Sequence, residues 1–173
     1  MGIMRLTKAK KSDFSNIYSH MERNFIRDEI RDYEDAIRIF DNKKYSIFQI
    51  FKDDLAVGFM CLWSLNGFSF LEHFVVYDEF RGKGYGSEAL ELLKKRCELL
   101  VLECEPPENA QQIRRVEFYK RHGMIINEYE YWQPSYRVDG QRCYLKLMST
   151  QKLISFEDTV KEIYSEVYQT KYE

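Results

Sequence analysis

A short segment rich in glycine and basic residues is the part of this chain whose residue types most clearly imply chemistry. The segment Arg81-Gly82-Lys83-Gly84-Tyr85-Gly86 follows an apolar run that ends at Val76, and it leads into an amphipathic helical pattern. Glycines let successive backbone N–H groups point into one concavity, and a helix N-terminus adds partial positive charge. Such a loop suits a pyrophosphate group, to which Arg81 and Lys83 can add formal charge.

A glycine-rich loop has several possible roles. It can be only a tight turn before a helix. A dinucleotide-binding loop of the G-x-G-x-x-G type would need glycine at position 87, which is Ser87, and it would follow its strand without the intervening residues 77–80. A Walker P-loop would need Gly-Lys-Ser/Thr after Gly86, which this chain lacks. A third interpretation, which the family resemblance described next supports, is a site for the pyrophosphate of coenzyme A.

Two segments resemble motifs of the GNAT superfamily of N-acetyltransferases. Residues 81–86 fit its coenzyme A motif, Arg/Gln-x-x-Gly-x-Gly/Ala after a strand and its turn, without a gap. Residues 118–124, FYKRHGM, look like the family's Phe/Leu-Tyr-x-x-x-Gly-Phe, with Met124 in place of the usual Phe. The chain departs from the family upstream of this motif, where Gln112 replaces a common Asn and Arg115 replaces a small residue.

The resemblance covers roughly residues 1–148 and implies that acetyl-CoA is the co-substrate, with no metal. In the family, the strand before the loop splays away from its parallel neighbour, and its free backbone groups pair with the pantetheine arm of coenzyme A. A backbone N–H near Phe74 would then polarise the thioester carbonyl. The residues that the resemblance places against the coenzyme are Phe74, Val75, Val76, Arg81, Gly82, Lys83, Gly84, Tyr85, Gly86, Ser87 and Gln112.

Acetyl transfer to an amine also needs a proton acceptor, because a primary amine has a pKa of about 10. Glu72 is the candidate, since it is a carboxylate inside an apolar strand and desolvation is expected to raise its pKa. Period-two alternation predicts that Glu72 shares a face with Phe74 and Val76, and that His73 points to the opposite face. The alternative is a structural carboxylate. Tyr119 matches the family's general acid for the coenzyme thiolate, and its alternative is a core tyrosine.

The elements that must position these residues alternate between strands and helices. The apolar patterns predict strands at 3–6, 45–51, 55–63, 68–76, 99–102, 125–132 and 142–148, and helices from Ser12 and at 27–40, 86–97 and 109–121. This order matches that of the GNAT family. The sequence therefore predicts a mixed α/β (α+β) fold with a central, mostly antiparallel twisted sheet of about seven strands. One splayed pair is expected to be parallel, and helices are expected to flank the sheet.

The last 25 residues, 149–173, lie outside the resemblance. Ser155 is expected to open a final helix, with Asp158 in the capping-box position and an apolar stripe from Phe156 to Tyr168. We therefore predict an acetyltransferase domain over 1–148, followed by an amphipathic helix that packs on this domain or on a partner. A monomer and a homodimer both remain open.

Composition narrows the class of protein. The chain has 173 residues, a net charge of −2 and an isoelectric point near 6.0, which favours neither nucleic acid nor an anionic membrane as a partner. The four cysteines have no metal-site spacing and are expected to be buried free thiols: Cys61, Cys97, Cys104 and Cys143. The chain has no apolar run of signal-peptide or membrane-span length, so a cytoplasmic location is expected.

The acceptor amine is not identified by the sequence. In the family, specificity comes from the loop between the first two helices and from the loop that joins the last two strands, here about 20–28 and 133–140. These segments carry a mixed set of side chains, so a small-molecule amine and a peptide amine both remain possible acceptors. A catalytically silent module that binds acyl-CoA is the alternative to an enzyme.

Overall fold

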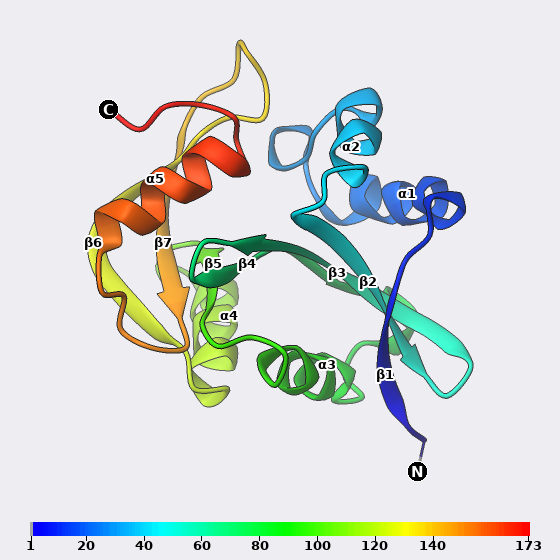
Figure 1. The fold of residues 1–173 in the computed structure, drawn as a ribbon. Helices are drawn as coiled ribbons and strands as arrows, with labels where there is room; N and C mark the ends of the chain where they lie inside the picture. The colour runs from blue at the N-terminus through cyan, green and yellow to red at the C-terminus, as the bar shows by residue number, and fades with distance from the viewer. Residues whose placement is uncertain (1) are drawn as a thin grey trace.

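The computed structural model describes residues 2–173, and within that range a seven-stranded sheet forms the centre of the molecule (Figure 1). The strands lie in the order β1-β2-β3-β4-β5-β7-β6, and neighbours are antiparallel except for the parallel pair β4 and β5. The predicted fold class is thereby confirmed. The strands are β1 (Met4–Lys8), β2 (Tyr45–Lys52), β3 (Leu55–Leu65), β4 (Phe68–Val76), β5 (Leu100–Cys104), β6 (Ile125–Gln133) and β7 (Cys143–Ser149).

Helices cover both faces of the sheet, and each face has its own apolar core (Figure 1). One face packs against α1 (Phe14–Asn24), α2 (Tyr33–Phe40) and α5 (Phe156–Glu166), and the other packs against α3 (Tyr85–Lys94) and α4 (Ala110–Arg121). Within residues 2–173, none of the helices combines the length and the apolarity that crossing a bilayer requires.

Two expectations about local structure are wrong. The helix predicted over 27–40 begins only at Tyr33, because a short 3₁₀ turn at Arg27–Glu29 is followed by extended backbone at Ile30, with φ −136° and ψ 157°. This extended stretch also brings the side chain of Arg31 into the interior. The second error concerns two cysteines that were expected to be buried. Cys143 is exposed because it begins β7 at the end of an exposed loop, and Cys97 is only half-buried because it lies beyond the end of α3.

Strands β4 and β5 separate soon after they meet. Their parallel pairing covers only Ser69 to Leu71 of β4, opposite residues 100–102 of β5. Beyond this point β4 continues to Val76 with an open edge, whereas β5 stays paired with β7 through Cys104. The sheet therefore contains the single splayed parallel pair that the sequence predicts.

Helix α5 packs on the same face of the sheet as α1 and α2. Ser155 caps its N-terminus, since the Ser155 hydroxyl accepts a hydrogen bond from the backbone N–H of Asp158 at 3.2 Å. Val160, Ile163 and Val167 are almost fully buried in the core of that face. The end of the helix reaches the middle of the sheet, where a guanidinium nitrogen of Arg31 donates to the carbonyl oxygen of Val167 at 2.8 Å.

Deleting residues 155–173 is expected to destabilise the protein and to make it aggregate. Each large apolar side chain that is removed from the core forfeits about 1.5–3 kcal/mol of burial, and a loss of several kcal/mol lowers the melting temperature by about 10 °C or more. Calorimetry and light scattering test this against a control that lacks only 171–173. A truncated chain that is a soluble monomer and as stable as the full chain would contradict the expectation.

Candidate active site

The glycine-rich loop adopts a backbone that only glycine accommodates freely. Gly82 has φ +76° and Gly84 has φ +80°, both in the left-handed region, and Gly84 is the N-cap of α3. A Cβ atom built at either position meets no other heavy atom within 4 Å, so the space beside the loop is open. Alternating left-handed residues before a helix N-terminus form a concavity of N–H donors that suits an anion. The loop therefore fits a pyrophosphate group.

The two basic residues of the loop differ in their contacts. Arg81 is tied down, because its Nε donates to the carbonyl of Val76 at 3.0 Å and its Nη2 donates to Asn24 at 2.7 Å. Its Nη1 also forms an ion pair with Asp78 at 3.0 Å. The ammonium of Lys83 lies over the ring of Phe80, 5.5 Å from its centroid. Arg81 thus holds the loop against β4 and α1, and Lys83 keeps its charge for a ligand.

The open edge of β4 presents the backbone of two of the three β4 residues that were predicted to contact the coenzyme. The N–H of Tyr77 donates to β3 at 2.9 Å, and alternation then turns the N–H and C=O groups of Val75 toward β3 as well. Phe74 and Val76 face the open edge instead, where the carbonyl of Val76 accepts the bond from Arg81. The N–H groups of Phe74 and Val76 and the carbonyl of Phe74 are left to receive a ligand.

A β-bulge in β4 changes the direction of the candidate base. Residue 61 of β3 pairs with His73, but residue 62 pairs with Leu71, so Glu72 is the extra residue. Glu72 and His73 consequently both point to the face covered by α1, α2 and α5, whereas Phe74 packs in the core of the α3 and α4 face. The prediction that Glu72 shares a face with Phe74 and that His73 opposes it is therefore wrong.

Glu72 is a completely buried carboxylate with a full set of hydrogen-bond donors. Arg31 Nη1 donates to its two oxygens at 3.1 and 2.8 Å, the indole N–H of Trp63 donates at 2.8 Å, and the hydroxyl of Tyr136 donates at 3.0 Å. Burial by itself raises the pKa of Glu72, but the charge of Arg31 and the hydrogen bonds from Arg31 and Trp63 together lower it below its ordinary value. The expectation of a raised pKa is therefore wrong, and Glu72 is the ionised half of a buried ion pair.

The structure reveals a second buried carboxylate that the sequence reasoning missed. Glu103 lies on β5, one residue beyond the last pair that β5 makes with β4. Its oxygens accept hydrogen bonds from the hydroxyl of Tyr131 at 2.5 Å, the hydroxyl of Tyr168 at 2.8 Å and the amide of Gln133 at 2.5 Å. Burial raises the pKa of Glu103 to about 7, although these donors act in the opposite direction. A glutamate inside the apolar run 99–104 was the signal that could have identified it.

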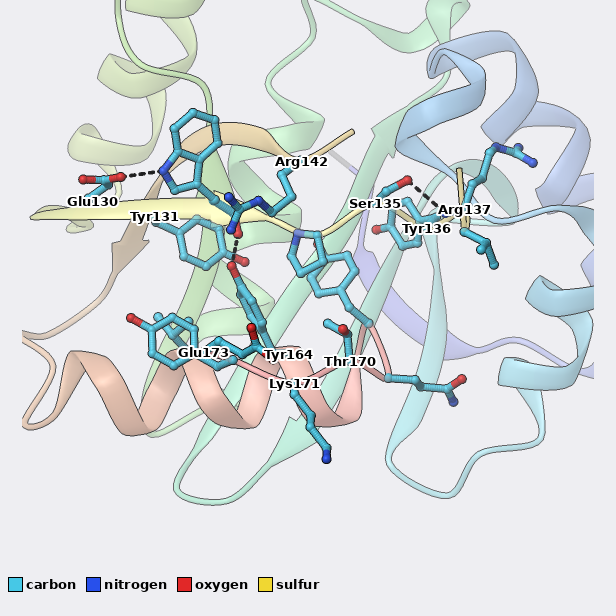
Figure 2. Close-up of a pocket in the computed structure, with 17 residues that line it drawn as sticks. Glu130, Tyr131, Ser135, Tyr136, Arg137, Arg142, Tyr164, Thr170, Lys171 and Glu173 are labelled. Carbon is cyan, nitrogen blue, oxygen red and sulfur yellow. Dashed lines mark hydrogen bonds between the residues drawn. The ribbon is translucent and has the colours of Figure 1, made fainter. Parts of the chain in front are cut away.

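Tyr136 and Tyr168 each contact one of the two carboxylates, and both line a cavity of about 1090 Å³ (Figure 2). The hydroxyl of Tyr136 bonds to Glu72, that of Tyr168 bonds to Glu103, and the centroids of the two rings are 5.2 Å apart. Figure 2 shows the cavity between β6, the β6–β7 loop and the C-terminal segment. Its aromatic lining consists of Tyr131, Trp132, Tyr136, Tyr164, Tyr168 and Tyr172.

The β6–β7 loop is docked on the segment between α1 and α2. Arg137, beside Tyr136 in Figure 2, forms an ion pair with Asp32 at 2.5 Å, and its guanidinium donates to the carbonyl of Arg27 at 3.1 and 3.3 Å. The two segments to which the sequence assigned acceptor specificity therefore touch each other over Glu72.

The remaining predicted residues lie on the α3 and α4 face. Tyr119 packs in the core of that face, and burial raises the pKa of its hydroxyl well above the ordinary value. Gln112 caps α4, since its side-chain oxygen accepts from the N–H of Asn109 at 3.1 Å and its nitrogen donates to Glu105 at 2.7 Å. The hydroxyl of Ser87 lies 3.0 Å from a ring nitrogen of His122.

In the part of the chain that the structure describes, no three His, Cys, Asp or Glu side chains gather closely enough to hold a metal ion.

Comparison with known proteins identifies the family. Residues 12–124 match the model of the Acetyltransferase (GNAT) family, so the chain belongs to this family, whose members are acyl-CoA-dependent N-acetyltransferases. A GNAT-family protein from Bacteroides thetaiotaomicron has 29% sequence identity and a TM-score of 0.91, and the match covers 96% of this chain and 99% of that one. The part of this chain that lies outside the 96% covered by the match is shorter than α5, so the similarity extends into this helix.

More distant solved structures share the fold. The ribosomal-protein-S18-alanine N-acetyltransferase of Escherichia coli has 17% identity and a TM-score of 0.62, with 90% of this chain and 98% of that one covered. An acetyltransferase structure from Salmonella typhimurium that contains acetyl-CoA has 16% identity and a TM-score of 0.57, with coverage of 88% and 97%. A search of curated proteins gave no match.

Proposed function

We propose that the protein transfers the acetyl group of acetyl-CoA to a primary amine by direct attack. The observation that carries the proposal is the split between β4 and β5, with an anion-binding loop on one side and two buried carboxylates on the other. The coenzyme would enter from the α3 and α4 face, and the amine would approach from the face of α1, α2 and α5. Family membership supports this assignment.

On the coenzyme side, the chain provides donors for an anion and a strand edge. Bound acetyl-CoA supplies the thioester. The N–H groups of Gly82 to Ser87 and the ammonium of Lys83 would bind the diphosphate. The free backbone groups of Phe74 and Val76 would pair with the pantetheine arm, and one of their N–H groups would polarise the thioester carbonyl.

On the amine side, Glu103 is better suited than Glu72 to accept the proton. A general base works best when its pKa lies near the operating pH, and the pKa of Glu103 is raised to about 7. Glu72 is held in its ionised form by Arg31, so it would be a weak base. We propose that Glu103 takes the amine proton through the hydroxyl of Tyr168, which lines the cavity and donates to Glu103 at 2.8 Å, and that Glu72 and Arg31 fix Tyr136. Glu72 as the base, which the sequence suggested, is the competing assignment.

The acceptor would occupy the aromatic cavity of Figure 2, close to Tyr136 and Tyr168. Aromatic faces attract cationic amines, and the two tyrosines separate the cavity from the carboxylates. A distant relative acts on the alanine of a ribosomal protein, so a peptide N-terminus joins small amines as a candidate acceptor.

A panel of small amines, polyamines, amino acids and peptides, supplied with acetyl-CoA, tests the proposed function. Release of free thiol should accelerate with at least one acceptor, and mass spectrometry should find that acceptor heavier by one acetyl group. Coenzyme A binding without transfer to any amine would instead favour a silent acyl-CoA-binding module.

Replacing Tyr119 by Phe should lower turnover by about 10²-fold or more if its hydroxyl protonates the leaving thiolate. Its raised pKa keeps the hydroxyl protonated across neutral pH, as an acid requires. The phenyl ring preserves the packing, so thermal stability and coenzyme A binding should change little. Unchanged turnover at every pH would show that Tyr119 is only a core residue.

A further inference from the structure

A chain of three hydrogen-bonded side chains lies beside the glycine-rich loop. The hydroxyl of Ser87, in the first turn of α3, is 3.0 Å from Nε2 of His122, which directly follows α4. The other ring nitrogen, Nδ1, is 2.7 Å from a carboxylate oxygen of Glu91, one turn further along α3. Neither His122 nor Glu91 has a role in the function proposed above.

The hydrogen bonds determine where the protons lie. Bonds from His122 and Lys94 lower the pKa of Glu91, so its carboxylate is ionised and only accepts. Nδ1 of His122 must then carry a hydrogen. In the neutral ring Nε2 is an acceptor, and it takes the hydrogen of the Ser87 hydroxyl. In the protonated ring Nε2 donates to Ser87, whose own hydrogen is then free for another acceptor.

The position of Ser87 indicates which group accepts the hydrogen of its hydroxyl. It lies in the first turn of α3, directly after the left-handed glycines, where backbone N–H groups converge on open space. Hydrolase triads share this order of hydroxyl, imidazole and carboxylate. Here, however, the hydroxyl stands at the anion-binding end of a helix, so a phosphate oxygen is its expected partner.

We propose that His122, held by Glu91, is a proton-linked part of the diphosphate site. When His122 takes up a proton, Ser87 becomes a donor to the diphosphate and the imidazolium adds positive charge nearby. Binding of the coenzyme therefore takes up a proton, and affinity falls as the pH rises. This inference rests on the proposed function, in which residues 82–87 bind the diphosphate.

Other groups near His122 do not replace it in this role. From α3, Glu91 and Lys94 face it, and they form an ion pair at 3.0 Å. On its own helix the ring of Phe118 packs 4.9 Å from the imidazole. The charged residues of that helix end are Glu117, Lys120 and Arg121, and Glu117 pairs with Lys120 at 3.8 Å. Of these side chains, only the imidazole can carry a hydrogen on one or on both of its ring nitrogens, so it alone can pass a proton toward Ser87.

Calorimetric titration with dephospho-coenzyme A tests the proposal. This probe keeps the diphosphate but lacks the phosphate monoester, which would itself titrate near pH 6. Wild-type affinity should fall by about ten-fold between pH 6 and 8, since one linked proton changes affinity by at most ten-fold per pH unit. The heat measured in buffers of different ionisation enthalpy should show uptake of up to one proton near neutral pH.

A His122→Gln variant should bind with nearly constant affinity over this range and take up no proton. The matched control is His20→Gln, which removes a histidine stacked on Tyr77 at 3.9 Å and should keep the wild-type pH dependence and proton uptake of dephospho-coenzyme A binding. Wild-type binding that is independent of pH and takes up no proton overturns the inference without any variant. The same pH dependence in His122→Gln also overturns it. No binding of coenzyme A by the wild type at any pH would instead refute the proposed function.

Discussion

Replacing Gly84 by Asp should abolish coenzyme A binding while the protein stays folded. Position 84 has φ +80° and caps α3, and Asp is among the residues that tolerate this backbone region and cap helices well. Its carboxylate would enter the open space beside the loop and repel a diphosphate. In wild type, coenzyme A at 100 times its dissociation constant should stabilise the fold by about 2.7 kcal/mol, or about 5–10 °C. The variant should show no such shift in a thermal melt.

Gly67→Asp is the matched control. Gly67 also has a left-handed backbone, with φ +85°, and a Cβ atom there likewise meets no other heavy atom within 4 Å. It lies in the turn between β3 and β4, away from the loop. This variant should carry similar backbone strain but keep the shift with coenzyme A. A preserved shift in Gly84→Asp, or a larger wild-type shift with NAD than with coenzyme A, would contradict the coenzyme A site.

Replacing Glu103 by Gln should lower turnover by about 10²–10⁴-fold, the usual contribution of a general base. A base acts in its ionised form, so wild-type activity should rise with pH through about 7, where Glu103 titrates, and this limb should vanish in the variant. In residues 2–173 no Lys, Arg or His side chain forms an ion pair with Glu103, whose partners are neutral donors, so the variant should lose less stability than Glu72→Gln. Rates of thiol release from pH 5 to 9, compared with thermal melts, measure both effects.

Glu72→Gln should differ from Glu103→Gln, because its main effect should be a large loss of folding stability. It leaves the buried Arg31 without its charged partner, which typically costs 3–5 kcal/mol and about 10 °C in melting temperature. Because the folded-state pKa of Glu72 is lowered, its stabilising effect is present at neutral pH and disappears as the pH falls through that pKa. The stability gap to wild type should therefore close in acid.

The two variants together identify the base. If Glu72→Gln keeps its melting temperature but loses turnover, and Glu103→Gln stays active, then Glu72 is the base and our assignment of Glu103 is wrong.

The sequence by itself determined the features that depend only on residues close together along the chain. Gly82 and Gly84 permit the left-handed backbone that the loop adopts, and Ser155 caps the helix that follows it directly. The periodic apolar patterns likewise specify the order of strands and helices, because each reflects the geometry of one element. These local signals were sufficient for the fold class and for the backbone of the glycine-rich loop.

Only the tertiary structure decided which of the two carboxylates has a raised pKa. The direction of Glu72 depends on a bulge that arises from the register with β3, which no residue of β4 reveals. Its ionisation depends on Arg31, 41 residues away, and on extended backbone where the pattern indicated helix. The partners of Glu103 come from positions 28 to 65 residues further along the chain. A pKa is the sum of burial and of such distant charges and donors, and these are assembled only when the chain folds.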